Sequence, residues 1–323
     1  MTSVTAQAQE QTPSRPPPSD RKSQLDGLAV ALLIGCCAVW GLGQVAAKVS
    51  LIEIPPLLQA AVRSAGALAL LAAWSAWRGL PLWRADGTGR AGWLAGTLFA
   101  AEFACIFLGL QFTTASRMVV FLYMSPFVVA LGMPFIVRSE QLSARQLTGL
   151  VVAFAGVVWA FAEGFAAPSA ERPLQWLGDA LGLVAAVFWG LTTLALRAGK
   201  LSNALPEKAL MYQLAVSAVA LAAASWLAGE AWPAQLTGVS LWPLAFQTVV
   251  VTFVSYLVWF WLMRHYPATR ISVFTLLTPV FGLFAGVLLL GEPLTLRLAV
   301  ALAAVCVGIG LVNRSANLKG PAT

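Results

Sequence analysis

One carboxylate lies deep inside an apolar stretch of this sequence. Glu102 is near the middle of AGWLAGTLFAAEFACIFLGL (91–110), which holds no other charged residue. An acidic side chain at the centre of a membrane helix costs roughly 2.5–3.5 kcal/mol on insertion scales, so such residues usually serve a function. We expect Glu102 to face a central cavity and either to carry a coupling proton or to bind a substrate ammonium. A structural acid bonded to a neighbouring helix is the alternative.

A cation occupies a comparable position in another apolar stretch. Arg63 lies in PPLLQAAVRSAGALALL (55–71), roughly 12 Å into the helix at 1.5 Å per residue. Three roles are open to it. The guanidinium can hold backbone carbonyls at broken helix ends, pair with Glu102, or take a substrate carboxylate. We expect the structural role.

Two aromatic residues are each followed, four positions later, by a polar residue. Trp40 precedes Gln44, and Trp189 precedes Thr193. Residues four apart share one face of a helix. Two such faces suit a cavity in which aromatic rings cover an amphipathic ligand, although packing between helices would give the same pattern.

A further aromatic group lies in TFVSYLVWFWLMRHY (252–266). Its later members are expected to form an aromatic belt at the membrane interface: Trp259, Phe260, Trp261 and Tyr266. Ser255 and Tyr256 come earlier in this run and therefore lie deeper. We predict that these two line the cavity.

Two prolines fall within apolar runs at related positions. Pro126 follows Tyr123 by three residues, and Pro279 follows Phe274 and Thr278. A proline inside a helix removes one hydrogen bond and favours a kink. The three preceding side chains are therefore predicted to point to the cavity, and the kinks to act as hinges or as fixed bends.

Little in the sequence favours an enzyme, a metal site or a cofactor. The four cysteines all lie in apolar runs, where cysteine behaves as a small hydrophobe, and we expect no disulfide. His265, the only histidine, is at a helix end, and Asp179 has no apparent partner for aspartyl chemistry. We therefore predict no catalytic residues, no metal and no cofactor.

The composition explains why these residues lie in apolar runs. Apolar residues make up 59% of the 323, charged residues only 10%, and the mean hydropathy is +0.80. A water-soluble protein carries about 25% charged residues, so the chain is expected to be an all-α integral membrane protein. About 20 apolar residues span a bilayer. Ten such runs are present, near 27–47, 56–77, 92–111, 117–137, 145–164, 175–196, 208–228, 241–263, 269–290 and 295–313.

The positive charges between the runs predict the topology. With the N-terminus inside, 15 of the 20 Lys and Arg residues are cytoplasmic, four (including Arg117) are outside, and Arg63 is within a helix. This bias places both termini in the cytoplasm. It also accounts for the net charge of +7 without nucleic-acid binding. Residues 1–24 are polar and Pro-rich and are expected to form a disordered cytoplasmic tail.

The two halves of the chain resemble each other. AVWGLGQVAAK (38–48) matches VFWGLTTLALR (187–197), and TTASRMVVFLYMSP (113–126) matches YPATRISVFTLLTP (266–279). At a third place Glu140 matches Glu292. Five spans per copy would invert the second copy in the membrane, as in many secondary transporters. We therefore predict repeats over 25–167 and 168–314, followed by a short cytoplasmic tail at 315–323.

Several stretches resemble a known family. LLTPVFGLFAGVLLLGEPLTLRLAVALAAVCVGIGLV (276–312), with Pro279 and the LGEPLT turn, is similar to the last two helices of EamA-type transporters in the drug/metabolite transporter superfamily. AVWG (38–41) and the Arg63 stretch resemble their first two helices. RSEQLS (138–143) departs from the LGE-like turn usual in the first repeat. The ten-helix layout and the Glu102–Phe103 pair resemble bacterial YddG-type aromatic amino-acid exporters.

The resemblance and the repeat together imply a secondary transporter in a bacterial inner membrane. The expected substrates are small metabolites, most of all neutral or aromatic amino acids, exported by alternating access with or without proton exchange. Export of drugs, nucleosides or sugars is the alternative. No GxxxxGK[ST] phosphate loop is present, so no ATPase partner is expected. The transporter would contact membrane lipid and be a monomer or a homodimer.

Overall fold

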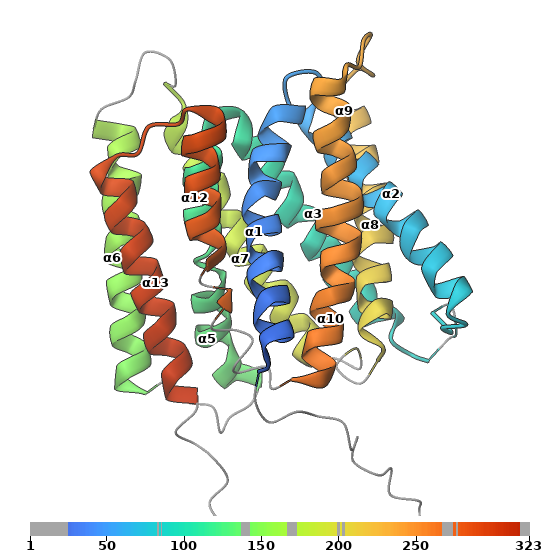
Figure 1. The fold of residues 1–323 in the computed structure, drawn as a ribbon, viewed down its shortest axis with the longest axis horizontal. Helices are drawn as coiled ribbons and strands as arrows, with labels where there is room; N and C mark the ends of the chain where they lie inside the picture. The colour runs from blue at the N-terminus through green and yellow to red at the C-terminus, as the bar shows by residue number, and fades with distance from the viewer. Residues whose placement is uncertain are drawn as a thin grey trace, which may run out of the picture.

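The computed structural model describes residues 25–82, 84, 86–136, 143–166, 173–198, 201, 204–266, 274–275 and 277–316. Every regular element within these ranges is a helix (Figure 1). The predicted tail over 1–24, Glu140 of the repeat match and most of the tail over 315–323 lie outside them.

Most of the apolar runs fold as single helices. Six long ones are α1 (Gly27–Ser50), α2 (Pro56–Trp77), α3 (Gly89–Phe112), α6 (Ala144–Ala166), α7 (Gln175–Ala198) and α8 (Pro206–Leu227). α12 (Leu277–Leu290) and α13 (Leu296–Ala316) follow near the end of the chain. Seven helical segments in the described ranges are long and apolar enough to cross a membrane, and three shorter apolar helices accompany them. Each of these ten described segments overlaps one of the ten predicted runs.

Two predicted runs do not form a single α-helix. The run over 117–137 is divided into α4 (Ala115–Leu122) and α5 (Ser125–Ile136), and the break falls at Tyr123 and Met124. Pro126 therefore lies in the first turn of α5, and Pro279 likewise lies in the first turn of α12. The expectation of mid-helix prolines is wrong, because both follow the start of a helix, where the missing N–H has no intrahelical partner to lose.

The run over 241–263 changes its helical type along its length. It comprises α9 (Gly238–Ala245), a π-helix, η2 (Phe246–Val254), and α10 (Ser255–His265), which form one continuous rod in Figure 1. A π-helix is rare and often lies at a functional site. η2 packs closely on α2, since a Cβ at Gly66 would come within 2.7 Å of Thr248.

The described helices form two large core clusters and a small third one, in which Ala29 and Leu33 of α1 pack with Leu262 and Tyr266. One large cluster is built mainly from α1, α2, α3 and α8, and the other from α4, α5, α6, α7, α12 and α13. α6 and α13 pack along each other at one edge of the bundle (Figure 1). Trp189 of α7 packs against both large clusters. The seam between these two clusters therefore runs past this residue.

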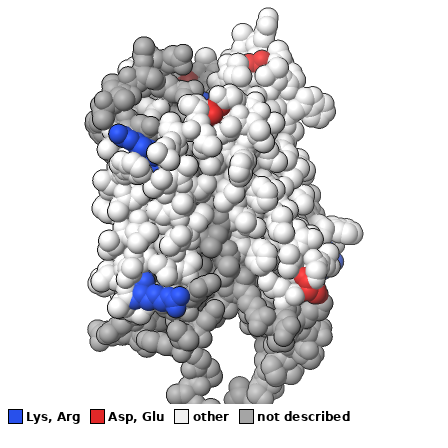
Figure 2. Space-filling model, turned by 60° about the vertical axis from the view of Figure 1, so that its left-hand side comes forward, with Lys and Arg blue, Asp and Glu red and all other residues white. Residues whose placement is uncertain are grey.

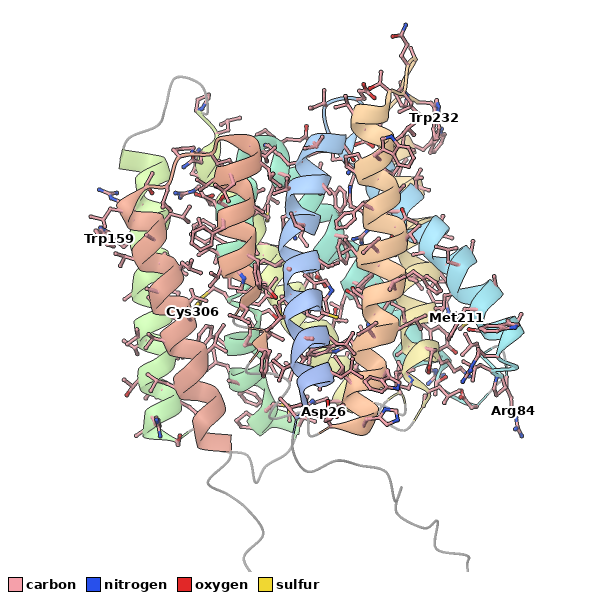
Figure 3. The ribbon with its side chains drawn as sticks, in the orientation of Figure 1. Asp26, Arg84, Trp159, Met211, Trp232 and Cys306 are labelled. Carbon is pink, nitrogen blue, oxygen red and sulfur yellow. The ribbon has the colours of Figure 1, made fainter. Side chains whose placement is uncertain are left out.

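The surface divides into an apolar band and two charged ends. Figure 2 shows Lys, Arg, Asp and Glu side chains only in an upper and a lower zone of one side, with an uncharged described surface between them. Large apolar side chains are exposed in such a band, among them Leu288 at 76% and Val219 at 71%. Figure 3 labels Asp26 and Arg84 at the lower end, which we call the near end, and Trp232 at the upper or far end.

Candidate functional site

Arg63 and Glu102 lie in the interior of the bundle, on α2 and α3. Each is only 5% exposed. The Arg63 Cζ lies 3.8 Å from the ring centroid of Phe103 and 5.4 Å from that of Phe107. Both rings come from α3, so the guanidinium packs against two aromatic side chains of that helix. A cation over an aromatic face is stabilised by about 2 kcal/mol or more when desolvated.

The polar atoms of this pair are not satisfied by the protein. Glu102 Oε2 and Arg63 Nε and Nη2 are buried and have no hydrogen-bond partner. The two side chains interact electrostatically with each other and with Tyr256 of α10, yet neither a hydrogen bond nor an ion pair joins them. Two of the three roles considered for Arg63, a grip on backbone carbonyls and a bond to Glu102, are therefore not observed.

A second group joins α1 to α10. Trp40 Nε1 donates to Ser255 Oγ at 2.7 Å, and Ser255 Oγ donates to the Val251 carbonyl of η2 at 2.5 Å. The Trp40 ring meets the Trp259 ring edge to face, with centroids 5.2 Å apart. Trp259, expected in an interfacial belt, thus packs on a candidate cavity residue.

The third group surrounds the break between α4 and α5. The Tyr123 ring meets the Trp189 ring edge to face at 5.5 Å. Thr278 lies close to Tyr123 and Cys37, although its Oγ1 has no hydrogen-bond partner. The break in the helix thus places a buried tyrosine at the seam.

The remaining predicted residues are placed less favourably. Thr193 Oγ1 donates to the Trp189 carbonyl of its own helix at 3.1 Å. Phe274 packs against the small cluster of Ala29, Leu33, Leu262 and Tyr266, and its carbonyl accepts a hydrogen bond from Cys37 Sγ at 3.2 Å. Gln44 is half-buried, and its Oε1 is without a partner. Tyr266, expected in the belt, is 1% exposed, and its hydroxyl donates to Asp26 at 2.9 Å.

One buried ion pair was missed from the sequence. Arg117 Nη2 lies 2.6 Å from Asp179 Oδ2, with side chains 4% and 0% exposed. Thr113 Oγ1 donates to Asp179 Oδ1 at 2.6 Å, and Arg117 Nη2 donates to the Ala160 carbonyl at 2.7 Å. Asp179 was considered only as an acid for aspartyl chemistry, and Arg117 only as an outer charge at the start of its run. The structure joins the two on packed helices. Opposite charges in two apolar runs were the available signal.

Polar side chains also join the two halves at the far end. Glu230 accepts hydrogen bonds from the N–H groups of Leu57 and Leu58 at 3.1 and 2.8 Å, capping α2. Glu53 accepts from the N–H of Thr237 at 2.8 Å and from its hydroxyl at 2.5 Å, and Thr237 is the N-cap residue of α9. The Thr237 hydroxyl and N–H lower the pKa of Glu53, because they stabilise its ionised form.

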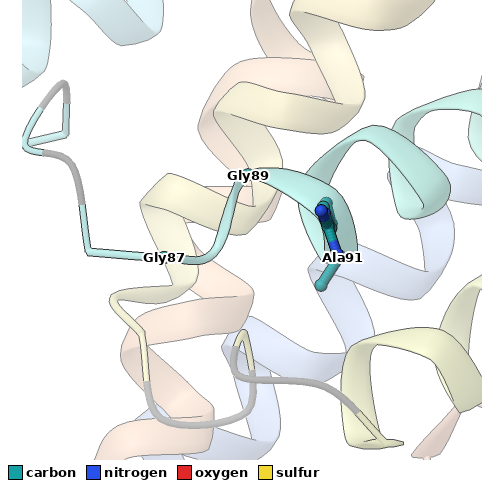
Figure 4. A pocket seen from close by; sticks show the side chains of 4 residues that line it. Gly87, Gly89 and Ala91 are labelled. Atoms are coloured by element: carbon teal, nitrogen blue, oxygen red, sulfur yellow. The ribbon is translucent and has the colours of Figure 1, made fainter.

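Two other features lie apart from this site. An open depression at the near end is lined by Gly87, Gly89, Arg90 and Ala91, where the chain enters α3 (Figure 4). An apolar groove runs between α1, α2 and α10 past Trp74 and Trp261. Three or more His, Cys, Asp or Glu side chains placed to hold a metal do not occur within the described ranges.

The sequence is similar to those of several bacterial transporters. The uncharacterized transporter YoaV of Bacillus subtilis is 25% identical over 279 residues, covering 86% of this chain and 94% of its own. The probable amino-acid metabolite efflux pump of Salmonella typhimurium is 27% identical, covering 92% of this chain and 100% of its own. The protein of the same description in Escherichia coli is 27% identical over 285 residues.

The fold is also shared with a solved structure. A crystal structure of a protein superposes with a TM-score of 0.64 at 17% sequence identity, covering 92% of this chain and 100% of that one. The model of the EamA-like transporter family matches residues 27–162 and again residues 176–314. These matches include nearly all of the helical bundle. The chain therefore belongs to the EamA-like transporter family of multi-pass membrane proteins.

Proposed function

We propose that this transporter exports small amphipathic metabolites, above all neutral or aromatic amino acids, across a bacterial inner membrane by alternating access. The observation that carries the proposal is the Arg63–Glu102 pair. A buried cation and a buried anion keep polar atoms without partners, and the cation lies against the Phe103 and Phe107 rings. Opposite charges beside aromatic rings suit a ligand with an ammonium, a carboxylate and an apolar side chain.

The packing supports ten spans arranged as two inverted repeats. Gly41 of α1 approaches Phe281 of α12, and its repeat mate Gly190 of α7 approaches Val128 of α5. α6 and α13, which the repeat aligns with each other, pack through matched glycines. Gly156 faces Ala301, and Gly308 faces Gly149. Such reciprocal contacts are expected of helices related by a two-fold axis.

The relatives support export as the direction of transport, and the charge bias supports the proposed topology in the membrane. Both termini are proposed to be cytoplasmic, since α1 begins and α13 ends at the same edge of the bundle (Figure 1). Two relatives of this chain are named probable amino-acid metabolite efflux pumps. Export of drugs, nucleosides or sugars by the same fold is the alternative. A purely apolar drug has no use for the two charges.

Flux measurements on the purified protein in liposomes test the proposal. We expect labelled phenylalanine and leucine to equilibrate or accumulate, and Glu102→Gln to reduce the rate at least about tenfold, the equivalent of 1.4 kcal/mol. Glu207→Gln, at the near end of α8, is the matched control. If a pH gradient drives accumulation and Glu102→Gln abolishes it, then Glu102 carries the proton.

Other outcomes decide against parts of the proposal. Equilibration that ignores the gradient indicates a facilitator in which Glu102 is a binding residue. A Glu102→Gln protein with unchanged rate and pH dependence would show that the acid is structural. Absence of amino-acid flux under any gradient would contradict amino-acid export and favour the alternative substrates.

A further inference from the structure

Arg63 is a buried cation whose charge the protein leaves unmatched. Its guanidinium packs against the Phe103 and Phe107 rings of α3, and two of its nitrogens have no hydrogen-bond acceptor. Burying a charge without a hydrogen-bonded partner is costly. A purely structural arginine would be expected to bond to a carbonyl or a carboxylate of the protein. Arg63 does neither.

The two unbonded nitrogens of Arg63 indicate which chemical group could bind to it. Nε and Nη2 lie on one edge of the planar guanidinium and together form a fork that fits the two oxygens of a carboxylate. Arg117 shows this mode in the same molecule. Its Nε donates to both Asp179 oxygens at 3.1 Å, and its Nη2 donates to Oδ2 at 2.6 Å. The atoms that Arg117 uses to hold a carboxylate are those that Arg63 leaves unused.

Building on the proposed function, we propose that the Nε–Nη2 edge of Arg63 binds the carboxylate of the transported substrate. Glu102, close by but not bonded to Arg63, is then left for the substrate ammonium. The ring stack on Phe103 holds the guanidinium while its edge stays free. Arg63 is thus a specificity-determining residue that selects carboxylate-bearing metabolites and rejects amines.

The test compares three ligands with the same aromatic ring. L-Phenylalanine carries both charges, 2-phenylethylamine lacks the carboxylate, and 3-phenylpropionate lacks the ammonium. Their binding to the purified protein is measured by calorimetry, and their uptake is measured in liposomes. We expect the amine to bind at least about tenfold more weakly than phenylalanine, as the loss of hydrogen bonds to a charged group implies. 3-Phenylpropionate loses the contact with Glu102 but should retain the part of its binding that depends on Arg63.

Substitution of the arginine tests the same contact from the protein side. Arg63→Gln should weaken phenylalanine and 3-phenylpropionate at least about tenfold and leave the amine unchanged. Arg63→Lys keeps the charge but not the fork, so it should restore binding only in part. Arg78→Gln, an exposed cation at the end of the same helix, is the control. The ligand comparison needs no variant, so it decides the question even if Arg63→Gln does not fold.

The outcomes separate this inference from the proposed function. Phenylalanine transport with equally tight binding of the amine would overturn the role of Arg63 alone. Binding of 3-phenylpropionate that depends on Arg63, without amino-acid flux, would overturn amino-acid export alone. Failure of all three ligands to bind would overturn both.

Discussion

Two pairs of opposite charges lie in the interior, and they are built differently. Arg117 and Asp179 make direct contact and are surrounded by further hydrogen bonds. Arg63 and Glu102 lie near each other but keep unpartnered atoms. The hydrogen-bonding groups of Arg117 and Asp179 are used within the fold, so this pair stabilises the packing. In the proposed function, the unpartnered atoms of Arg63 and Glu102 remain available to the substrate.

The Arg117–Asp179 ion pair should therefore contribute strongly to the stability of the fold. Asp179→Asn leaves the Arg117 guanidinium buried without an anion, and removal of one partner of a buried ion pair costs about 3–5 kcal/mol. We expect a clear fall in the midpoint of thermal unfolding in detergent. The double variant Arg117→Met/Asp179→Leu should recover much of the loss, since it removes both charges. An unchanged midpoint in Asp179→Asn would contradict a structural role for the pair.

Sequence reasoning located individual residues better than their contacts. Glu102 and Arg63 were identified because a charge in an apolar run is costly wherever the helix packs. Arg117 stands at the start of its run and was counted only as an outer charge, because its partner comes from a helix 62 positions later. The bond from Trp40 to Ser255 likewise joins residues 215 positions apart. Periodicity within one helix carries no information on such pairings.

At the level of elements, apolar run length predicted the helices and missed the interruptions. Three glycine pairs with GxxxG spacing pack against neighbouring helices of the same bundle. Gly92 and Gly96 face Tyr212 and Val216 of α8. Gly178 and Gly182 face α3 and α4, while Gly282 and Gly286 face α4. The break at Tyr123 and the π-helix η2 leave no mark in hydropathy, because lipid-compatible side chains continue through them.

The connection between α2 and α3 is fastened to α8 by a charge contact at the near end. Lys208 Nζ donates to Asp86 Oδ2 at 2.7 Å and to the Arg84 carbonyl at 2.5 Å. The Lys208 ammonium, with the Thr88 hydroxyl, lowers the pKa of Asp86 from 3.8 to about 2. Folding therefore favours the ionised carboxylate, and this contribution is present above the unfolded pKa.

That contribution should be lost as the pH falls from about 4 to about 2. We expect the unfolding midpoint of the wild type to exceed that of Asp86→Asn by a constant amount above pH 4. The difference should shrink as the pH is lowered towards 2. The measurement is thermal unfolding of both proteins in detergent across this range, with Glu207→Gln as control. A difference that does not change with pH would mean that the Asp86 charge is not involved.

At the scale of the whole molecule, the uncharged band and the charged ends predict a fixed orientation in the membrane. Arg84 and Trp232 lie at opposite ends (Figure 3). We expect a cysteine at Trp232→Cys to react with an impermeant maleimide added outside spheroplasts. Arg84→Cys should react only after the membrane is permeabilised. The four native cysteines are first replaced, and reversed labelling would contradict cytoplasmic termini.

The rod of α9, η2 and α10 holds a surplus residue in its π-helical part. Each i→i+5 turn of a π-helix takes up one residue more than an α-helical turn. A deletion of one residue within Phe246–Val254 is therefore expected to convert such a turn into an α-helical one without breaking the rod. Because the α-helical turn completes the same rotation with one residue fewer, Ser255 should still face Trp40. A deletion within α10 has no surplus residue to remove and would rotate the residues after it by about 100°.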